Sequence, residues 1–99
     1  MSGYFRRKIV FMEGQHSILN IFGGGYSKML QEILKLTDRN VNRFSSNREN
    51  REKIMKKLRI TQITYQRRLK WLRDKRILLP VKDGGRGVYH FNRDIIRFQ

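Results

Sequence analysis

The sequence has no cysteine, a single proline and no long apolar run. Without cysteine it can form neither a disulfide nor a thiolate metal site, so cysteine usage says nothing about the redox compartment. No apolar segment approaches the roughly 18 residues of a membrane span, and the N-terminal MSGYFRRKIVFMEG lacks the apolar core of a signal peptide. We therefore expect a cytoplasmic protein with no membrane partner.

Acidic residues are also scarce. Eight Asp and Glu stand against 23 Lys and Arg, which gives a formal net charge of +15. Residues 50–99 hold fifteen of the basic residues and only four acidic ones, whereas residues 1–49 hold eight and four. Such an excess of one sign costs stability through self-repulsion, so a polyanion is the expected partner. Nucleic acid is the first candidate and an anionic membrane surface the second, and we expect the second half to make the contact.

The residues that are present suffice for one small folded domain, 1–99. The hydrophobic share is 38%, with six Phe, four Tyr and one Trp, which is too much for a disordered basic tail. His16 and His90 lie far apart, and no Ser-His-acid order, paired carboxylates or metal-ligand spacing stands out. We therefore expect no enzyme, no catalytic residue, no cofactor and no metal.

The first half predicts three short features before its main helix. KIVFM (8–12) is typical of an edge strand, and HSILNIF (16–22) of a short helix. The three glycines at 23–25 are followed by Ser27-Lys28, the wrong order and spacing for a phosphate-binding loop. We expect a hinge or a helix C-cap there.

A core helix is expected at 26–38, where Met29, Leu30, Ile33, Leu34 and Leu36 recur at helical spacing. Residues 39–47 predict a polar loop anchored by Val41 and Phe44, with room for a short strand.

The second half predicts two helices. Ser46 or Asn47 would cap a helix at 48–58 that points Ile54 and Leu58 inward. Thr61 would cap the next helix, 62–76. On a helical wheel its buried side would contain Tyr65, Leu69, Leu72 and the stem of Arg76.

A β-hairpin is expected at 78–92, LLPVKDGGRGVYHFN, with glycines supplying the positive φ of a tight turn. Pro80 would make the first strand an edge strand. Two helices with a three-residue turn, followed by a hairpin, indicate an α+β, mainly α, winged helix-turn-helix. The helix-turn-helix would span about 48–76 and the wing about 78–92, with a short N-terminal strand.

Residues 53–78, KIMKKLRITQITYQRRLKWLRDKRIL, resemble the winged helix-turn-helix of bacterial and phage regulators. The ending RGVYHFNRDII is similar to the close of the plasmid replication initiator family RepL. The resemblance implies DNA binding in replication initiation or transcription regulation, in a bacterial cytoplasm and encoded by a plasmid or phage. Arg59 stands where the family turn usually has glycine, so a positive-φ cost of about 1 kcal/mol is expected there.

The fold assigns roles to the cations and polar residues. The first two turns of the second helix would read base edges in the major groove of double-stranded DNA, through Gln62, Ile63, Thr64, Gln66 and Arg67. Phosphates would be contacted by Arg48, Arg51, Lys53, Lys56, Lys57, Lys70 and Arg73. On the wing, Lys82 and Arg86 would reach the adjacent minor groove.

Several alternatives stay open. The basic surface can be a solvated face with no specific partner, or belong to a non-specific architectural or virion-associated nucleoprotein. A winged fold can also dock on a polymerase or virion protein, in which case Trp71 would join an apolar patch. Otherwise Trp71 would pack under the wing or join a partner subunit. A homodimer would have to use the N-terminal strand or the 26–38 helix.

Overall fold

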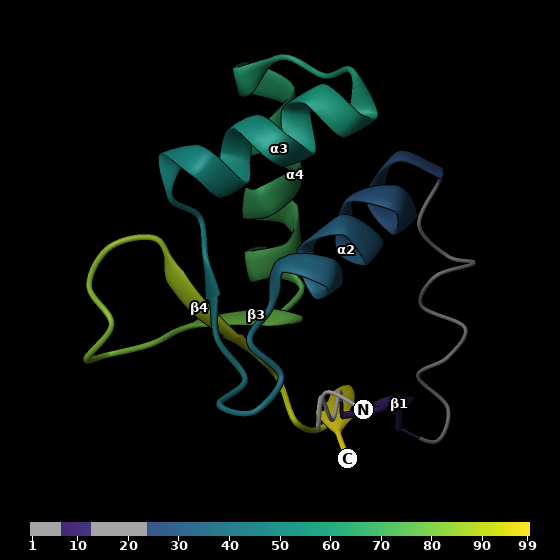
Figure 1. The fold of residues 1–99 in the computed structure, drawn as a ribbon, viewed down its shortest axis with the longest axis vertical. Helices are drawn as coiled ribbons and strands as arrows, with labels where there is room; N and C mark the ends of the chain where they lie inside the picture. Colours follow the sequence, from purple (N-terminus) through teal and green to yellow (C-terminus); the bar gives the residue numbers. More distant parts are fainter. Residues whose placement is uncertain (1–6, 13–23) are drawn as a thin grey trace, which may run out of the picture.

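The computed structural model describes residues 7–12 and 24–99, which form three helices and two small antiparallel sheets (Figure 1). The helices are α2 (Gly24–Leu36), α3 (Arg48–Leu58) and α4 (Gln62–Asp74). The strands are β1 (Ile9–Phe11), β2 (Phe44–Ser45), β3 (Leu78–Pro80), β4 (Val88–Phe91) and β5 (Ile96–Phe98). The α+β class is confirmed. The short helix expected at 16–22 lies outside the described residues.

Helix α2 carries the apolar stripe that its sequence predicts, with Met29, Leu30, Ile33 and Leu34 buried in the core. The hinge or C-cap expected at the glycines is wrong for Gly24 and Gly25, because both belong to the first turn of α2. A Cβ at Gly25 would lie 2.7 Å from Nη2 of Arg68. The missing side chain therefore lets α2 and α4 approach closely.

Helix α3 occupies the predicted residues, and Asn47 rather than Ser46 caps it. The Asn47 side chain accepts a hydrogen bond from the backbone N–H of Asn50 at 2.8 Å. The helix ends at Leu58, and its C-cap Arg59 has a left-handed φ of 55° and ψ of 49°, with its N–H donating to the carbonyl of Met55. The positive φ expected at Arg59 is confirmed.

Helix α4 begins at its predicted cap, since the Thr61 hydroxyl accepts from the N–H of Thr64 at 3.2 Å. Its end differs from the prediction, because the helix stops at Asp74 and not at residue 76. Arg76 adopts a φ of 58°, and the N–H of Ile77 donates to the carbonyl of Leu72 at 3.0 Å. This closing turn leaves Arg76 exposed, so the expectation that its stem joins the buried side is wrong.

One sheet has the order β2-β4-β3, so the expected edge position of the strand with Pro80 is confirmed. The connection between β3 and β4 is longer than the tight turn expected, since residues 81–87 lie outside both strands. Gly85 and Gly87 both have a φ of 77°, which any other residue would adopt at a cost. In Figure 1 this hairpin loop projects from the body on the side away from α2.

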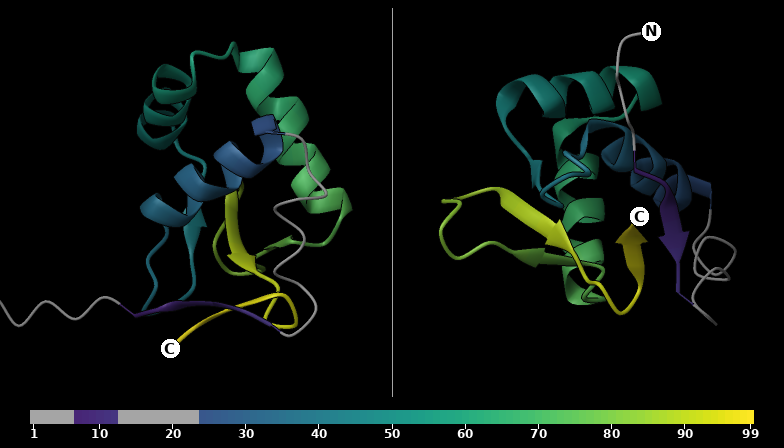
Figure 2. Two further views of the ribbon diagram at one scale, coloured as in Figure 1. Left: turned by 90° about the vertical axis from the view of Figure 1, so that its right-hand side faces the viewer. Right: turned by 60° about the horizontal axis from the view of Figure 1, so that its bottom comes forward.

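The second sheet pairs β1 with β5, placing Ile9 opposite Phe98. The strand at 8–12 was expected, whereas its partner β5 was not. In Figure 1 and in the left view of Figure 2, α3 lies at one end of the molecule and β1 lies at the other. The two lie along the longest axis, which extends 37 Å.

The loop from α2 to β2 is tied to β4 by Asn42, which is buried at a φ of 53°. Its carboxamide donates to the carbonyl of Phe91 at 3.0 Å and accepts from the N–H of Phe91 at 2.9 Å. Phe44 is fully buried, as expected, but Val41 is 58% exposed and is not an anchor. Asn42, and not Val41, therefore anchors this loop to the body of the protein.

Among the described residues, no helix is both long enough and apolar enough to span a membrane.

Candidate nucleic-acid interface

The first two turns of α4 present a polar surface to solvent. Gln62, Ile63, Gln66 and Arg67 are exposed, and we call them the exposed α4 face. Ile63 is 72% exposed, which is unusual for a large aliphatic side chain. The helix has no acidic residue before Asp74, so nothing on α4 offsets the partial positive charge of its N-terminus. This face can offer hydrogen bonds, one methyl-rich contact and a cation to an anionic partner.

Thr64 differs from the other residues assigned to base contacts. It is half-buried, and its hydroxyl accepts from the hydroxyl of Thr61 at 3.1 Å. The structure thus ties the Thr64 side chain to the helix cap.

The buried side of α4 is fixed by Tyr65, Leu69 and Leu72, as the sequence predicts. The Tyr65 hydroxyl is hydrogen-bonded to the hydroxyl of Ser46 at 2.6 Å. Burial raises the pKa of the Tyr65 phenol above its ordinary value of 10.0, and this rise is opposed by the Ser46 hydrogen bond and by the charge of Arg51. The phenol therefore stays protonated at neutral pH and holds α4 against the segment before α3.

Four of the five cations of α3 form two groups, and the fifth, Arg51, is half-buried and lines the cavity described below. Near its start, Arg48 pairs with Glu52 at 3.1 Å and Lys53 with Glu49 at 3.2 Å, each as an exposed i,i+4 pair. At its end Lys56 and Lys57 are exposed and form no ion pair within the part of the chain that the structure describes. The C-terminal end of α3 therefore has the larger uncompensated charge.

A shallow cavity of about 210 Å³ lies between the start of α3 and the start of α4. Its lining consists of Arg48, Arg51, Glu52, Met55 and Gln62. Gln62 is thus the member of the exposed α4 face that adjoins the cations at the start of α3.

The cations in the second half of α4 have partners within the protein. Lys70 pairs with Asp74 at 3.0 Å, and the guanidinium of Arg73 lies 5.9 Å from the ring centroid of Tyr89 on β4. Both remain exposed. They can still meet a phosphate, but only in competition with these contacts.

Trp71 does not pack under the hairpin. Its ring lies on Tyr26 of α2, with centroids 4.5 Å apart, and Nζ of Lys75 lies 5.6 Å from its centroid. Trp71 is half-buried in this arrangement. The expectation that Trp71 packs under the hairpin is therefore wrong, and Tyr26 covers part of its ring.

The hairpin loop presents Lys82 and Arg86 as exposed cations, together with the exposed Asp83. Its base is joined to the segment before α3, because the N–H of Ser46 donates to the carbonyl of Gly87 at 2.7 Å. Ser46 therefore contacts both the hairpin and Tyr65 of α4. The sequence pattern offered Ser46 only as a helix cap, and this connecting role was missed.

Among the described residues, no group of His, Asp and Glu is arranged to hold a metal ion. Comparison with known proteins finds no matching family model, no matching curated protein and no matching solved structure. A function for this chain must therefore be inferred from its own residues and their geometry.

Proposed function

We propose that this chain is a sequence-specific double-stranded DNA-binding protein with a winged helix-turn-helix arrangement. Helices α3 and α4 would be the helix-turn-helix, because only residues 59–61 separate them. The β3–β4 hairpin follows α4 after residues 75–77 and would be the wing. The order of elements supports this arrangement.

The observation that carries the proposal is the exposed α4 face. Gln66 and Arg67 are open to solvent, and neither makes a side-chain hydrogen bond or ion pair with the described residues. The same turns are held rigidly on their other side by Tyr65 and Leu69. A rigid helix with free donors and acceptors at its N-terminal end is what major-groove reading requires.

Each side chain on this face suits a base edge. Arg67 can donate two hydrogen bonds to the O6 and N7 of guanine, and Gln62 or Gln66 can pair with the N6 and N7 of adenine. Ile63 can cover a thymine methyl group. A good bidentate contact discriminates against the wrong base by about 1–3 kcal/mol.

The surrounding cations would contact phosphates and add affinity without sequence information. Lys56 and Lys57 are the strongest candidates, since no acidic partner competes for them in the described structure. Arg48 and Lys53 would have to release Glu52 and Glu49, which costs little for exposed pairs. Arg86 at the hairpin loop would reach a minor groove narrowed by A·T pairs.

The biological role that we propose, replication initiation or transcription regulation in a bacterial cytoplasm, rests on the resemblance to RepL-type initiators and related regulators. The geometry supports duplex binding equally in either process. Selection of bound duplexes from a random pool would identify the target site. Two half-sites at a fixed spacing in the selected DNA would show that a homodimer binds.

The decisive experiment compares the selected duplex with a random duplex by fluorescence anisotropy for the wild type and Arg67→Ala. We expect the selected site to bind roughly 10³-fold tighter than random DNA in the wild type. Arg67→Ala should lose about ten-fold or more of that preference, because a bidentate base contact is removed. Unchanged discrimination would overturn the assignment of α4 as the reading helix.

Lys56→Ala is the matched control, since it also removes one exposed cation. It should weaken selected and random duplexes alike and reduce the slope of log K against log salt by about 1. A loss of discrimination equal to that of Arg67→Ala would show that charge alone, rather than base reading, explains both variants.

The net charge of +15 favours a second candidate, a non-specific architectural or virion-associated nucleoprotein. In that case the same helix would act as a charged wedge without a preferred sequence. The selection experiment separates the two, because a non-specific protein yields no enriched site and binds all duplexes with one salt-dependent affinity.

A further inference from the structure

A second concentration of positive charge lies at the other end of the molecule, in a cavity of about 480 Å³. Four arginines line it, and none of its described lining residues is acidic; we call it the arginine pocket. Its full lining is Arg7, Arg39, Asn40, Val41, Asn42, Arg93, Arg97, Phe98 and Gln99.

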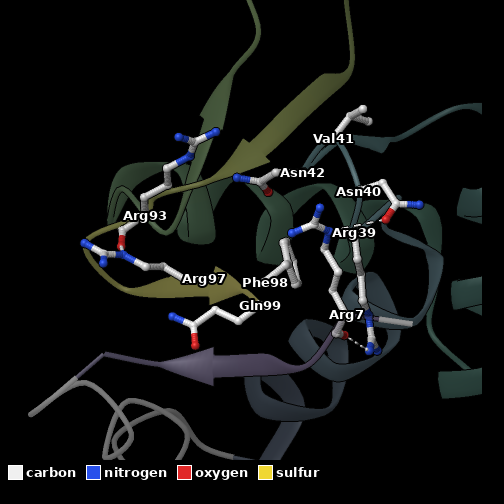
Figure 3. Close-up of a pocket in the computed structure, with 9 residues that line it drawn as sticks. All are labelled: Arg7, Arg39, Asn40, Val41, Asn42, Arg93, Arg97, Phe98 and Gln99. Atoms are coloured by element: carbon white, nitrogen blue, oxygen red, sulfur yellow. Dashed lines mark hydrogen bonds between the residues drawn. The ribbon is translucent and has the colours of Figure 1, made fainter. Parts of the chain in front are cut away.

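Three segments far apart in the sequence build this pocket. Figure 3 shows Arg93 and Arg97, from the turn into β5 and from β5 itself, on one side. Arg7 and Arg39 lie on the other side, with Phe98 between the two pairs. The pairing of β1 with β5 brings the first and last of these segments together, and the hydrogen bond from Arg39 to the carbonyl of Arg7 joins the middle segment to them.

Hydrogen bonds to neutral oxygens orient several of these arginines. Arg7 Nε donates to Oδ1 of Asn40 at 3.3 Å, and Arg39 donates to the carbonyl of Arg7 at 2.9 Å. Arg97 Nε donates to the carbonyl of Arg93 at 2.9 Å. Because their acceptors carry no charge, these hydrogen bonds position the guanidinium groups of Arg7 and Arg97 without neutralising them.

Like charges lining one concavity repel each other, and a concave surface of one sign concentrates the field. An anionic ligand with several charges would relieve that repulsion. Guanidinium groups suit phosphate oxygens because they donate pairs of parallel hydrogen bonds. Asp38 and Asp94 are close in sequence to lining residues but do not themselves line the pocket, and Asp38 accepts from the N–H of Asn40.

Besides its arginines, the pocket is lined by carboxamide and apolar side chains, which a site for phosphate alone would not need. Asn40 and Gln99 add carboxamides with donors and acceptors, while Phe98 and Val41 add apolar surface. A volume of about 480 Å³ is in the ordinary range for small-molecule ligands. A nucleotide combines these features, because it carries phosphates at one end and a flat base with polar edges at the other.

We propose that the arginine pocket binds a nucleotide unit through its phosphates, either as a free nucleotide or as the phosphorylated end of a single-stranded nucleic acid. The β1–β5 segments that help to line the pocket and the start of α4 lie toward opposite ends of a molecule 37 Å long (Figure 1). A duplex seated on α4 and a nucleotide in the pocket would therefore be bound at the same time. The proposal does not depend on the function proposed for α4.

The test measures binding by isothermal titration calorimetry with separate probes. These are ATP, inorganic triphosphate, a single-stranded oligonucleotide with and without a 5′-phosphate, and a poly-glutamate peptide. We expect saturable binding of ATP or of the 5′-phosphorylated strand, tighter than binding of the unphosphorylated strand and of the peptide. Whichever of ATP and the phosphorylated strand binds more tightly identifies the source of the nucleotide.

Three double variants locate the binding. Arg93→Ala with Arg97→Ala should weaken the nucleotide at least tenfold, since two charge-assisted contacts are lost. Arg93→Lys with Arg97→Lys keeps the charge but loses the paired hydrogen bonds, so part of the loss should remain. Lys28→Ala with Lys35→Ala on α2 removes the same charge from residues that do not line the arginine pocket, and it should leave nucleotide binding within twofold.

Urea denaturation of each variant establishes that it is folded before its binding is compared. The proposal would be overturned if Lys28→Ala with Lys35→Ala weakened nucleotide binding as much as Arg93→Ala with Arg97→Ala, because diffuse charge would then explain the binding. It is also overturned if no phosphate-bearing probe binds, or if the peptide binds as tightly as ATP. Arg67→Ala should leave nucleotide binding unchanged, because Arg67 does not line the arginine pocket. A failure of duplex binding can therefore be told apart from a failure of nucleotide binding.

Discussion

The two ends of the molecule both carry an excess of cations, but they differ in shape and in what accompanies the charge. At the α3–α4 end the cations are spread along two helices with uncharged Gln and Ile side chains among them, and Arg48 and Arg51 line a smaller cavity. At the β1–β5 end four arginines line one cavity, and hydrogen bonds to neutral oxygens hold several of them. The first arrangement suits a long partner lying across the surface, and the second suits a small partner that enters it.

This difference between the two ends shows that net charge alone does not determine which cations are available to an anionic ligand. Near the start of α3, Glu49 and Glu52 balance two cations at a distance of one helical turn. In the arginine pocket no acidic side chain is among the described lining residues. Local pairing and shape therefore decide which cations are available, even though the whole chain carries +15.

The largest stability effect should come from breaking the β1–β5 end at Asn42. Asn42→Ala removes both hydrogen bonds to the backbone of Phe91 and places alanine at a φ of 53°. We expect the free energy of unfolding to fall by about 3 kcal/mol, because the N–H of Phe91 loses its Asn42 acceptor, the carbonyl of Phe91 keeps only its contact with Nδ1 of His90 among the described residues, and alanine must adopt a left-handed conformation. Urea denaturation measures this change.

Asn42→Gly is the control for the backbone contribution. Glycine tolerates the positive φ, so the free energy of unfolding should fall by about 1 kcal/mol less for Asn42→Gly than for Asn42→Ala. Duplex affinity per folded molecule should be unchanged in both variants, since the exposed α4 face is at the other end. A parallel loss of duplex affinity would show that the two ends are coupled.

The α3–α4 end should respond more weakly to loss of its own polar anchor. Tyr65→Phe removes the hydrogen bond between the phenol and the hydroxyl of Ser46. We expect the free energy of unfolding to fall by about 1 kcal/mol, the usual net value of one hydrogen bond. Ser46→Ala should cost a similar amount, and the double variant should cost less than the sum of the two if the hydrogen bond is the cause.

The same variant tests the pH dependence of stability. Because the pKa of Tyr65 is raised in the folded state, the folded protein holds the phenol proton more tightly than the unfolded chain does. This contribution is fully present below the unfolded value near 10 and is lost as the pH rises through the higher folded pKa. The difference in stability between wild type and Tyr65→Phe should therefore narrow above about pH 10, and a constant difference would contradict the assignment.

Much of the α3–α4 end could be predicted from the sequence because its signals are local. Thr61 precedes a run of helix formers, and Tyr65, Leu69 and Leu72 recur at helical spacing, so cap and buried side were both predicted. The left-handed Arg59 was expected only from the resemblance, because Arg59 stands where the turn of the family usually has glycine. The end of α4 was misplaced because Arg76 closes the helix in a conformation that usually indicates glycine or asparagine.

The β1–β5 end could not be predicted in the same way because its contacts join residues far apart in the chain. Phe98 pairs with Ile9, and Asn42 clamps Phe91, but neither pairing has a periodic pattern in the sequence. Val41 was chosen as an anchor on hydrophobicity alone, whereas the buried carboxamide beside it is the actual anchor. The arginine pocket depends on all of these pairings, so no local pattern could indicate it.

A smaller effect of opposite sign is expected at the turn between α3 and α4. Arg59→Gly should raise the free energy of unfolding by about 0.5–1 kcal/mol, because glycine adopts a φ of 55° without a steric cost. Arg59→Ala keeps the cost and removes only the side chain, so it is the matched control for the lost charge. A destabilised glycine variant would show that the Arg59 side chain contributes more than its backbone costs.

The smallest effect should come from releasing a cation at the start of α3. Glu52→Gln removes the partner of Arg48, in the cavity that also contacts Gln62. An exposed i,i+4 pair is worth at most about 0.5 kcal/mol, so stability should barely change. Duplex binding should become about twofold tighter for selected and random sequences alike, because one negative charge near the phosphates is gone.

This result tests the comparison between the two ends of the molecule. If Glu52→Gln strengthens duplex binding and leaves ATP binding unchanged, local pairing controls which cations each partner meets; if both ligands respond equally, only the total charge matters.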